Sequence, residues 1–214
     1  MDIKTLIKKG PSARPPKIML IGVEGVGKST AGAQMPAPVF ICGENGLVGP
    51  QFEDVPNYTP EKWQDVLDFV DALAAEPSGY KSLVIDTLDW IEPMLYAHVV
   101  NSQNKPEYKT IADIPFGRGI PLAQNEARKL IVRLDKVNAA GMNVLILSHS
   151  QEQGDEKCGD QGSQKTQTDY TGRNQRFIDV WISVRHRAAS LFIIRFKISV
   201  SDGGAKTFQY RSKC

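Results

Sequence analysis

Short apolar runs of strand length alternate with longer stretches of helical character through the first 150 residues of the chain. The apolar runs lie at residues 17–21, 39–42, 82–86 and 143–147, and the predicted helices lie at 61–76, 88–100 and 123–139. This alternation predicts an α/β fold, with a mainly parallel central sheet and helices on both of its faces.

The pattern changes after Ser150. Residues 151–176 are rich in Gln, Gly, Asp, Ser and Thr, and we expect a long polar loop that is mobile or functional. Residues 178–184, 191–200 and 207–211 are predicted strands joined by tight turns, which favours an antiparallel C-terminal extension of the sheet. We therefore expect an N-terminal tail over residues 1–16 and a single domain over residues 17–214.

One segment fits a phosphate-binding pattern. Residues 22–30 match G-x-x-x-x-G-K-[ST], the Walker A motif, between a predicted strand and a predicted helix. In such a loop, backbone N–H groups surround the β-phosphate of a nucleoside triphosphate, Lys28 reaches the β- and γ-phosphates, and the Ser29 hydroxyl ligates Mg²⁺. The alternative is a chance glycine-rich turn, although every position of the motif is filled. The predicted nucleotide-binding residues are Gly22, Val23, Glu24, Gly25, Val26, Gly27, Lys28, Ser29 and Thr30.

A carboxylate ends the strand predicted at residues 82–86. In a doubly wound sheet, ligands bind beyond the carboxyl ends of the strands. Asp86 is therefore predicted to hold the hydration shell of Mg²⁺, as a Walker B residue does, while capping of the next helix is the alternative. We expect the neighbouring Asp89 to face solvent or the start of that helix.

Two more strand ends carry candidate catalytic groups. Glu44 follows the second strand and is the candidate base for the water that attacks the γ-phosphate. Glu24 in the loop competes for that role, and an ordinary turn glutamate is the alternative. His149 follows the fourth strand, where we expect it to contact the γ-phosphate and to couple its loss to the order of the polar loop. The predicted catalytic set is thus Lys28, Glu44, Asp86 and His149.

Composition bears on the partners of the protein and on the compartment in which it works. The chain has 214 residues and a formal net charge of +2, too small to argue for or against nucleic acid. Its three cysteines are scattered without a C-x-x-C pair, as in a reducing compartment, and support neither zinc nor a disulfide framework. No apolar run is long enough to span a bilayer and the N-terminus lacks a signal-peptide region, so we expect a cytoplasmic protein.

The same segments resemble those of a known family. They are KIMLIG at 17–22 with GKST at 27–30, FICGENGL at 40–47, LVIDTLDW at 83–90, FGRG at 116–119 and NVLILSH at 143–149. Together they are similar to the RecA-like AAA-type ATPases of bacteriophages, and most to the minimal RecA-type single-strand annealing proteins. The resemblance covers about residues 16–150.

The resemblance implies an ATP- and Mg²⁺-dependent enzyme of phage DNA recombination that binds or anneals single-stranded DNA. Its implied partners are a single-strand DNA-binding protein and further copies of the chain in a ring or filament. By position, it implies that Glu44 is the catalytic glutamate and that His149 replaces a glutamine that senses the γ-phosphate. It also implies DNA-binding loops at 151–176 and near 101–118.

Basic residues gather near the end of the sequence, opposed only by Asp202: Arg185, His186, Arg187, Arg195, Lys197, Lys206, Arg211 and Lys213. They are interpreted as a phosphate track for DNA, as cations that reach a neighbouring subunit's γ-phosphate, or as a solvated sheet edge. Two other functions stay open. One is a nucleotide-gated loader or regulator of a replication protein, with slow ATPase and no direct DNA role. The other is a small-molecule kinase, for which the chain lacks a clear arginine-rich lid.

Overall fold

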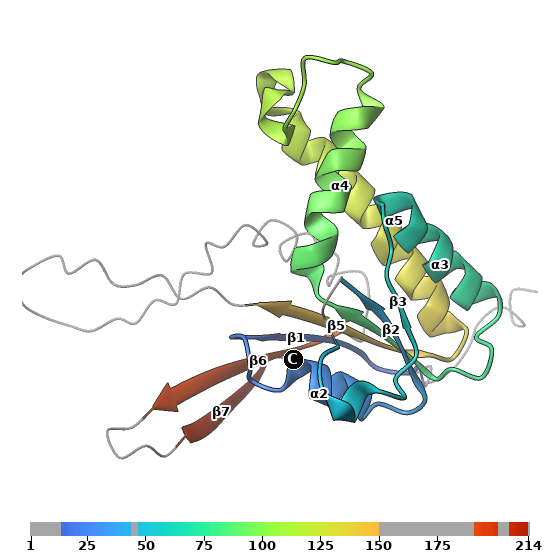
Figure 1. The fold of residues 1–214 in the computed structure, drawn as a ribbon, viewed down its shortest axis with the longest axis vertical. Coiled ribbons are helices and arrows are strands. Elements are labelled where there is room, and N and C mark those ends of the chain that lie inside the picture. The colour runs from blue at the N-terminus through green and yellow to red at the C-terminus, as the bar shows by residue number, and fades with distance from the viewer. Residues whose placement is uncertain (1–13, 44–46, 150–190, 201–205, 214) are drawn as a thin grey trace, which may run out of the picture.

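The computed structural model describes residues 14–43, 47–149, 191–200 and 206–213, the last two ranges through their backbone alone. Within these ranges, the centre of the fold is a seven-stranded sheet of order β3-β2-β4-β5-β1-β6-β7 (Figure 1). Its strands are β1 (Lys17–Gly22), β2 (Pro38–Cys42), β3 (Asn57–Tyr58), β4 (Ser82–Asp86), β5 (Asn143–His149), β6 (Leu191–Val200) and β7 (Lys206–Lys213).

The sheet is parallel except at its C-terminal edge, as predicted. β1 pairs in parallel with β5 on one side and with β6 on the other, and among the described strands only β7 runs antiparallel, against β6. The expected antiparallel extension is therefore β7, while β6 continues the parallel sheet. The predicted strand at 178–184 lies outside the described residues.

Helices cover both faces of the sheet (Figure 1). One face carries α3 (Trp63–Ala75), α4 (Leu88–Ser102) and α5 (Gly119–Ala139), and the other carries the short α2 (Lys28–Ala33). Three 3₁₀ turns complete the described elements: η1 (Pro50–Phe52), η2 (Ile111–Asp113) and η3 (Pro115–Gly117). In the described part of the chain, no helix combines the length and the apolar character needed to cross a membrane.

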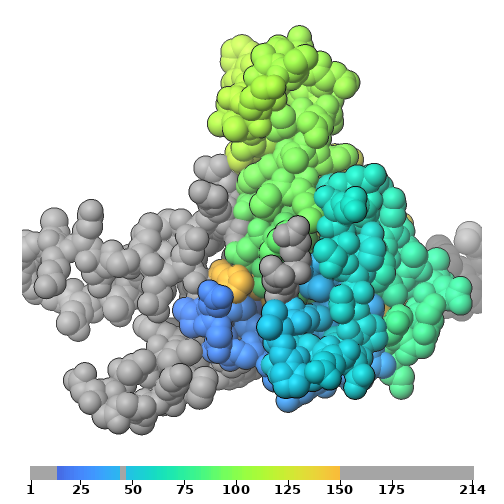
Figure 2. Space-filling view, in the orientation of Figure 1, coloured from blue at the N-terminus to red at the C-terminus, as the bar shows by residue number. Residues whose placement is uncertain are grey.

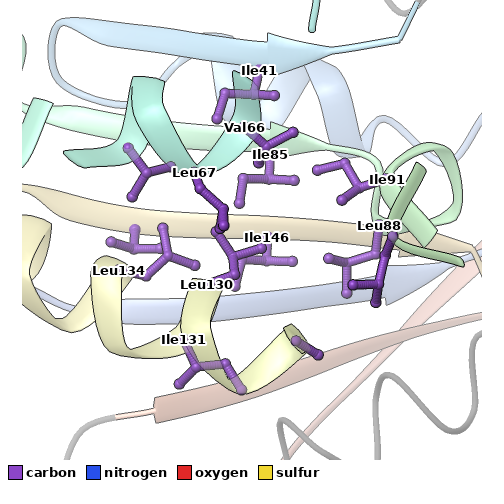
Figure 3. Close-up of a cluster of buried hydrophobic side chains, with 14 of the residues drawn as sticks. Ile41, Val66, Leu67, Ile85, Leu88, Ile91, Leu130, Ile131, Leu134 and Ile146 are labelled. Carbon is purple, nitrogen blue, oxygen red and sulfur yellow. The ribbon is translucent and has the colours of Figure 1, made fainter. Parts of the chain in front are cut away.

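The larger core lies between the sheet and the three long helices (Figure 3). Ile85 and Ile146 point to this side, where Leu130 of α5 packs with them in the same cluster. Val84 and Leu145, the next positions along β4 and β5, belong to a smaller cluster on the α2 side. The central strands therefore bury both of their faces, which is why they appear in the sequence as unbroken apolar runs rather than alternating ones.

Two local predictions were wrong at element boundaries. α5 begins at Gly119, four residues before the predicted start at 123. Pro121 is compatible with this earlier start, because proline is tolerated in the first helical turn, where its missing N–H would have had no partner. The sequence predicts a turn at residues 57–60, whereas Asn57 and Tyr58 form the strand β3. It has only two residues, too few for a periodic pattern, and its pairing with β2 defines it.

Candidate functional site

The segment between β1 and α2 has the backbone that the Walker A motif predicts. Gly25 and Gly27 have φ angles of 73° and 92°, left-handed values that glycine adopts without a steric penalty. A Cβ at either position would meet no atom within 4 Å. Backbone conformation, rather than lack of space, is therefore what requires glycine here.

Lys28, the first residue of α2, is buried, with 5% of its surface exposed. Its Nζ donates hydrogen bonds to the carbonyl oxygens of Gly22 at 2.9 Å and Val23 at 2.8 Å. Burial lowers the pKa of Lys28, and the negative charges of Asp86, Asp89 and Glu24 offset part of that effect. The loop thus holds its lysine within the field of three carboxylates.

Asp86, at the end of β4, is equally buried. Burial raises the pKa of its carboxyl group, while a hydrogen bond with Ser29 and the charge of Lys28 act in the opposite direction. Within the described residues, its Oδ2 atom is buried without a hydrogen-bond partner. A hydroxyl beside a carboxylate with a spare oxygen is the donor set that a hydrated Mg²⁺ needs. These residues therefore fit the predicted metal.

His149 and Asp89 meet at the edge of the sheet, a contact that the sequence did not predict for Asp89, which was expected to face solvent or the helix start. Asp89 Oδ2 accepts a hydrogen bond from the backbone N–H of His149 at 3.1 Å and lies 3.3 Å from its Nδ1. Burial acts to raise the pKa of Asp89, but the hydrogen bonds from His149 outweigh it and hold that pKa below its ordinary value. The first turn of α4 is therefore tied to the end of β5, a contact between residues 60 positions apart.

Lys28, Asp86 and His149 line one cleft of about 530 Å³, and Asp89 lies behind His149 without lining it. Figure 2 shows its borders on one face, where the blue loop after β1, the orange end of β5 and the green start of α4 lie together. The predicted residues in its lining are Glu24, Gly25, Gly27, Lys28, Ser29, Thr30, Asp86 and His149. Gly22, Val23 and Val26 do not line it, although Gly22 and Val23 hold Lys28 through their carbonyl groups.

The apolar side of this cleft was not predicted from the sequence. Val48, Phe52 and Trp90 line it together with the polar groups. Trp90 is 40% exposed, and a Cβ built on Gly43 would lie 2.2 Å from its ring. The sequence could have indicated Trp90 as a cleft residue, because it comes only four residues after the strand-end carboxylate of Asp86. The helical pattern by itself predicts only that Trp90 lies on a helix.

Several predicted groups lie outside the described residues: Glu44, the loop 151–176 and the basic residues 185–187. Of the other basic residues, Arg195 and Arg211 are register partners of β6 and β7. Across the part of the chain that the structure describes, no cluster of three or more His, Cys, Asp or Glu residues forms a further metal site.

One comparison with known proteins is positive. A family model described as an AAA domain matches residues 14–181, which is more than half of the chain and includes the whole cleft. No curated protein sequence matches the chain.

Proposed function

Because the chain belongs to this AAA domain family, we propose that it is a Mg²⁺-dependent ATPase of phage DNA recombination that binds or anneals single-stranded DNA. Membership makes it an AAA-type P-loop ATPase with a nucleotide site. The observation that carries the ATPase part of the proposal is the convergence of Lys28, Asp86 and His149, from three different elements, on one cleft.

The chemistry of the cleft supports nucleotide hydrolysis. Left-handed glycines open the loop's backbone N–H groups to a β-phosphate, and Lys28 supplies a charge that burial leaves unscreened. Ser29 and Asp86 would hold Mg²⁺, which neutralises phosphate charge when bound. Exchange of the lysine's carbonyl partners for phosphate oxygens would strengthen its hydrogen bonds, because a charged acceptor binds an ammonium more tightly than a neutral one.

The remaining parts of the proposal rest on the sequence. Glu44 is the candidate base for the attacking water. The loop 151–176 and the basic residues 185–213 are the candidate DNA contacts, with a single-strand DNA-binding protein and other copies of the chain as partners.

The test is the steady-state ATPase rate with and without single-stranded DNA. Wild-type protein should hydrolyse ATP and be stimulated by the DNA, whereas Lys28→Ala should do neither. Lys129→Ala removes a surface lysine that pairs with Glu126 on α5 and serves as the matched control, which should keep the wild-type rate.

Two outcomes separate the candidate functions. Turnover that DNA leaves unchanged contradicts the recombination role and favours a nucleotide-gated loader or regulator of a replication protein. Absence of turnover under both conditions contradicts the ATPase proposal itself. Glu44→Gln should retain ATP binding and lose hydrolysis, and a wild-type rate in that variant would make Glu44 an ordinary turn residue.

A further inference from the structure

The contact between Asp89 and His149 uses one carboxylate oxygen for two groups of the same residue. Asp89 Oδ2 accepts from the His149 backbone N–H at 3.1 Å and lies 3.3 Å from Nδ1 of the ring. The backbone bond fixes where the strand ends, and the ring contact fixes how the imidazole is turned. Both side chains are partly sheltered, with 37% of the His149 side chain and 27% of the Asp89 side chain exposed.

This contact determines which ring nitrogen is available to a ligand. A carboxylate beside Nδ1 favours the form of the ring in which Nδ1 carries a hydrogen. His149 also lines the cleft that contains Lys28 and Ser29. Nε2 is then the ring atom left for a phosphate oxygen in that cleft.

We propose that Asp89 is a positioning residue for nucleotide recognition. It holds His149 with Nδ1–H toward its own carboxylate and Nε2 toward the γ-phosphate, and it is the counter-ion of the imidazolium that donates to that phosphate. The inference rests on the proposed function, since it requires a triphosphate in the cleft.

The charges around the ring support this assignment. Asp89 contacts the ring from α4, with its Oδ2 atom 3.3 Å from Nδ1, and Asp86 of β4 lines the same cleft as His149. Lys28 of α2 lies in the field of the same two carboxylates, and Glu24 lines the cleft from the loop. Loss of Asp89 therefore removes the negative charge that contacts the ring directly.

The test compares ADP with the non-hydrolysable analogue β,γ-imido-ATP by calorimetric titration, because the ratio of their Kd values isolates the γ-phosphate. In wild-type protein the analogue should bind more tightly than ADP. Asp89→Asn and His149→Ala should each reduce the preference by about tenfold, the equivalent of one hydrogen bond to a charged group, with ADP binding unchanged. The double variant should lose no more than either single variant, because both changes remove one interaction.

Asp65→Asn is the matched control. Asp65 also lies in the first turn of a helix, α3, and accepts hydrogen bonds from the backbone N–H groups of Glu61 and Lys62. It does not line the cleft, so its substitution should leave the ratio unchanged.

One further readout separates positioning from general structural support. In ¹⁵N-labelled wild-type protein, the neutral His149 ring should carry its hydrogen on Nδ1, a measurement that requires no variant to fold.

The proposal is overturned if the neutral ring carries its hydrogen on Nε2 instead of Nδ1, by a wild-type ratio in Asp89→Asn, or by losses that add in the double variant. Failure of wild-type protein to bind either nucleotide would instead remove the proposed function and this inference with it. Binding of both nucleotides with an unchanged ratio in Asp89→Asn removes the positioning role alone.

Discussion

At the scale of single residues, the cleft holds a lysine and an aspartate of opposite charge, each with 5% of its surface exposed. Burial lowers the pKa of Lys28 and raises that of Asp86, so desolvation dominates their mutual attraction. Burying these two charges therefore costs more free energy than their attraction returns. Their presence beside a cleft indicates a role in binding rather than in folding.

We predict that Asp86→Asn leaves the free energy of unfolding unchanged or raises it, because a buried charge is replaced by a neutral group of the same shape. The same variant should lose ATP turnover by roughly 100-fold or more, the usual scale for removing an electrostatic contact from an active site. Urea unfolding and steady-state kinetics measure the two effects. Asp71→Asn breaks an ion pair with Arg133 outside the cleft and should keep turnover. Marked destabilisation of Asp86→Asn would contradict the argument.

Asp89 should make stability depend on pH. Its pKa in the folded protein lies below the ordinary value, so its ionised form adds stability above that ordinary value, about 4. This contribution is lost as the pH falls through the lowered folded pKa. Asp89→Asn should therefore be less stable than wild-type protein at neutral pH, and the gap should narrow below about pH 4. Urea unfolding across that range measures it, and a gap independent of pH would contradict the assignment.

At the scale of elements, the cleft depends on how closely α4 approaches the end of β2. Trp90, in the first turn of α4, lies over Gly43, where a Cβ would be 2.2 Å from the ring. The Gly43 N–H also donates to the carbonyl of Asp86 at 3.4 Å. Glycine at position 43 is therefore required by close packing, in contrast to Gly25 and Gly27, where backbone conformation is the reason.

We predict that Gly43→Ala destabilises the protein by about 1–3 kcal/mol, the usual cost of overpacking. Introduction of Trp90→Ala into this variant should recover part of the loss, because the ring that meets the new methyl group is gone. Urea unfolding of the two single variants and the double variant measures the coupling. Additive losses would show that the ring is not the obstacle.

At the scale of the whole molecule, residues of α2, α4, β4 and β5 line the cleft. The two strands are neighbours in the sheet, and the two helices cover its opposite faces. A ligand that contacts these elements together binds the folded state alone, because the unfolded chain does not assemble the cleft. Ligand binding and global stability are then linked by mass action.

We predict that ATP with Mg²⁺ at one hundred times its Kd stabilises the fold by about 2.7 kcal/mol. For a chain of this size, that corresponds to a rise in Tm of roughly 5–10 °C. Thermal denaturation with and without the nucleotide measures the shift. Lys28→Ala should show no shift at the same concentration, and an equal shift in that variant would place the nucleotide elsewhere.

Much of this architecture is determined by local patterns. The four apolar runs predicted by the sequence are β1, β2, β4 and β5, and the phosphate loop needs only its own glycines and lysine to be identified. Asp86 and His149 were predicted for the cleft because parallel strands bring their carboxyl ends to the same edge. Each of these predictions needs only a short, continuous stretch of sequence.

The features that only the tertiary structure decided are contacts between distant segments. Asp89 meets His149 across 60 positions, Trp90 covers Gly43, and β3 exists only through its pairing with β2. No periodicity encodes such pairs, because each depends on the angle and depth at which a helix or strand packs. The sequence by itself therefore determined the phosphate loop, the mainly parallel sheet and the strand ends that carry the polar groups. Packing between elements decided which side chains touch, and so which nitrogen of His149 is left for a ligand.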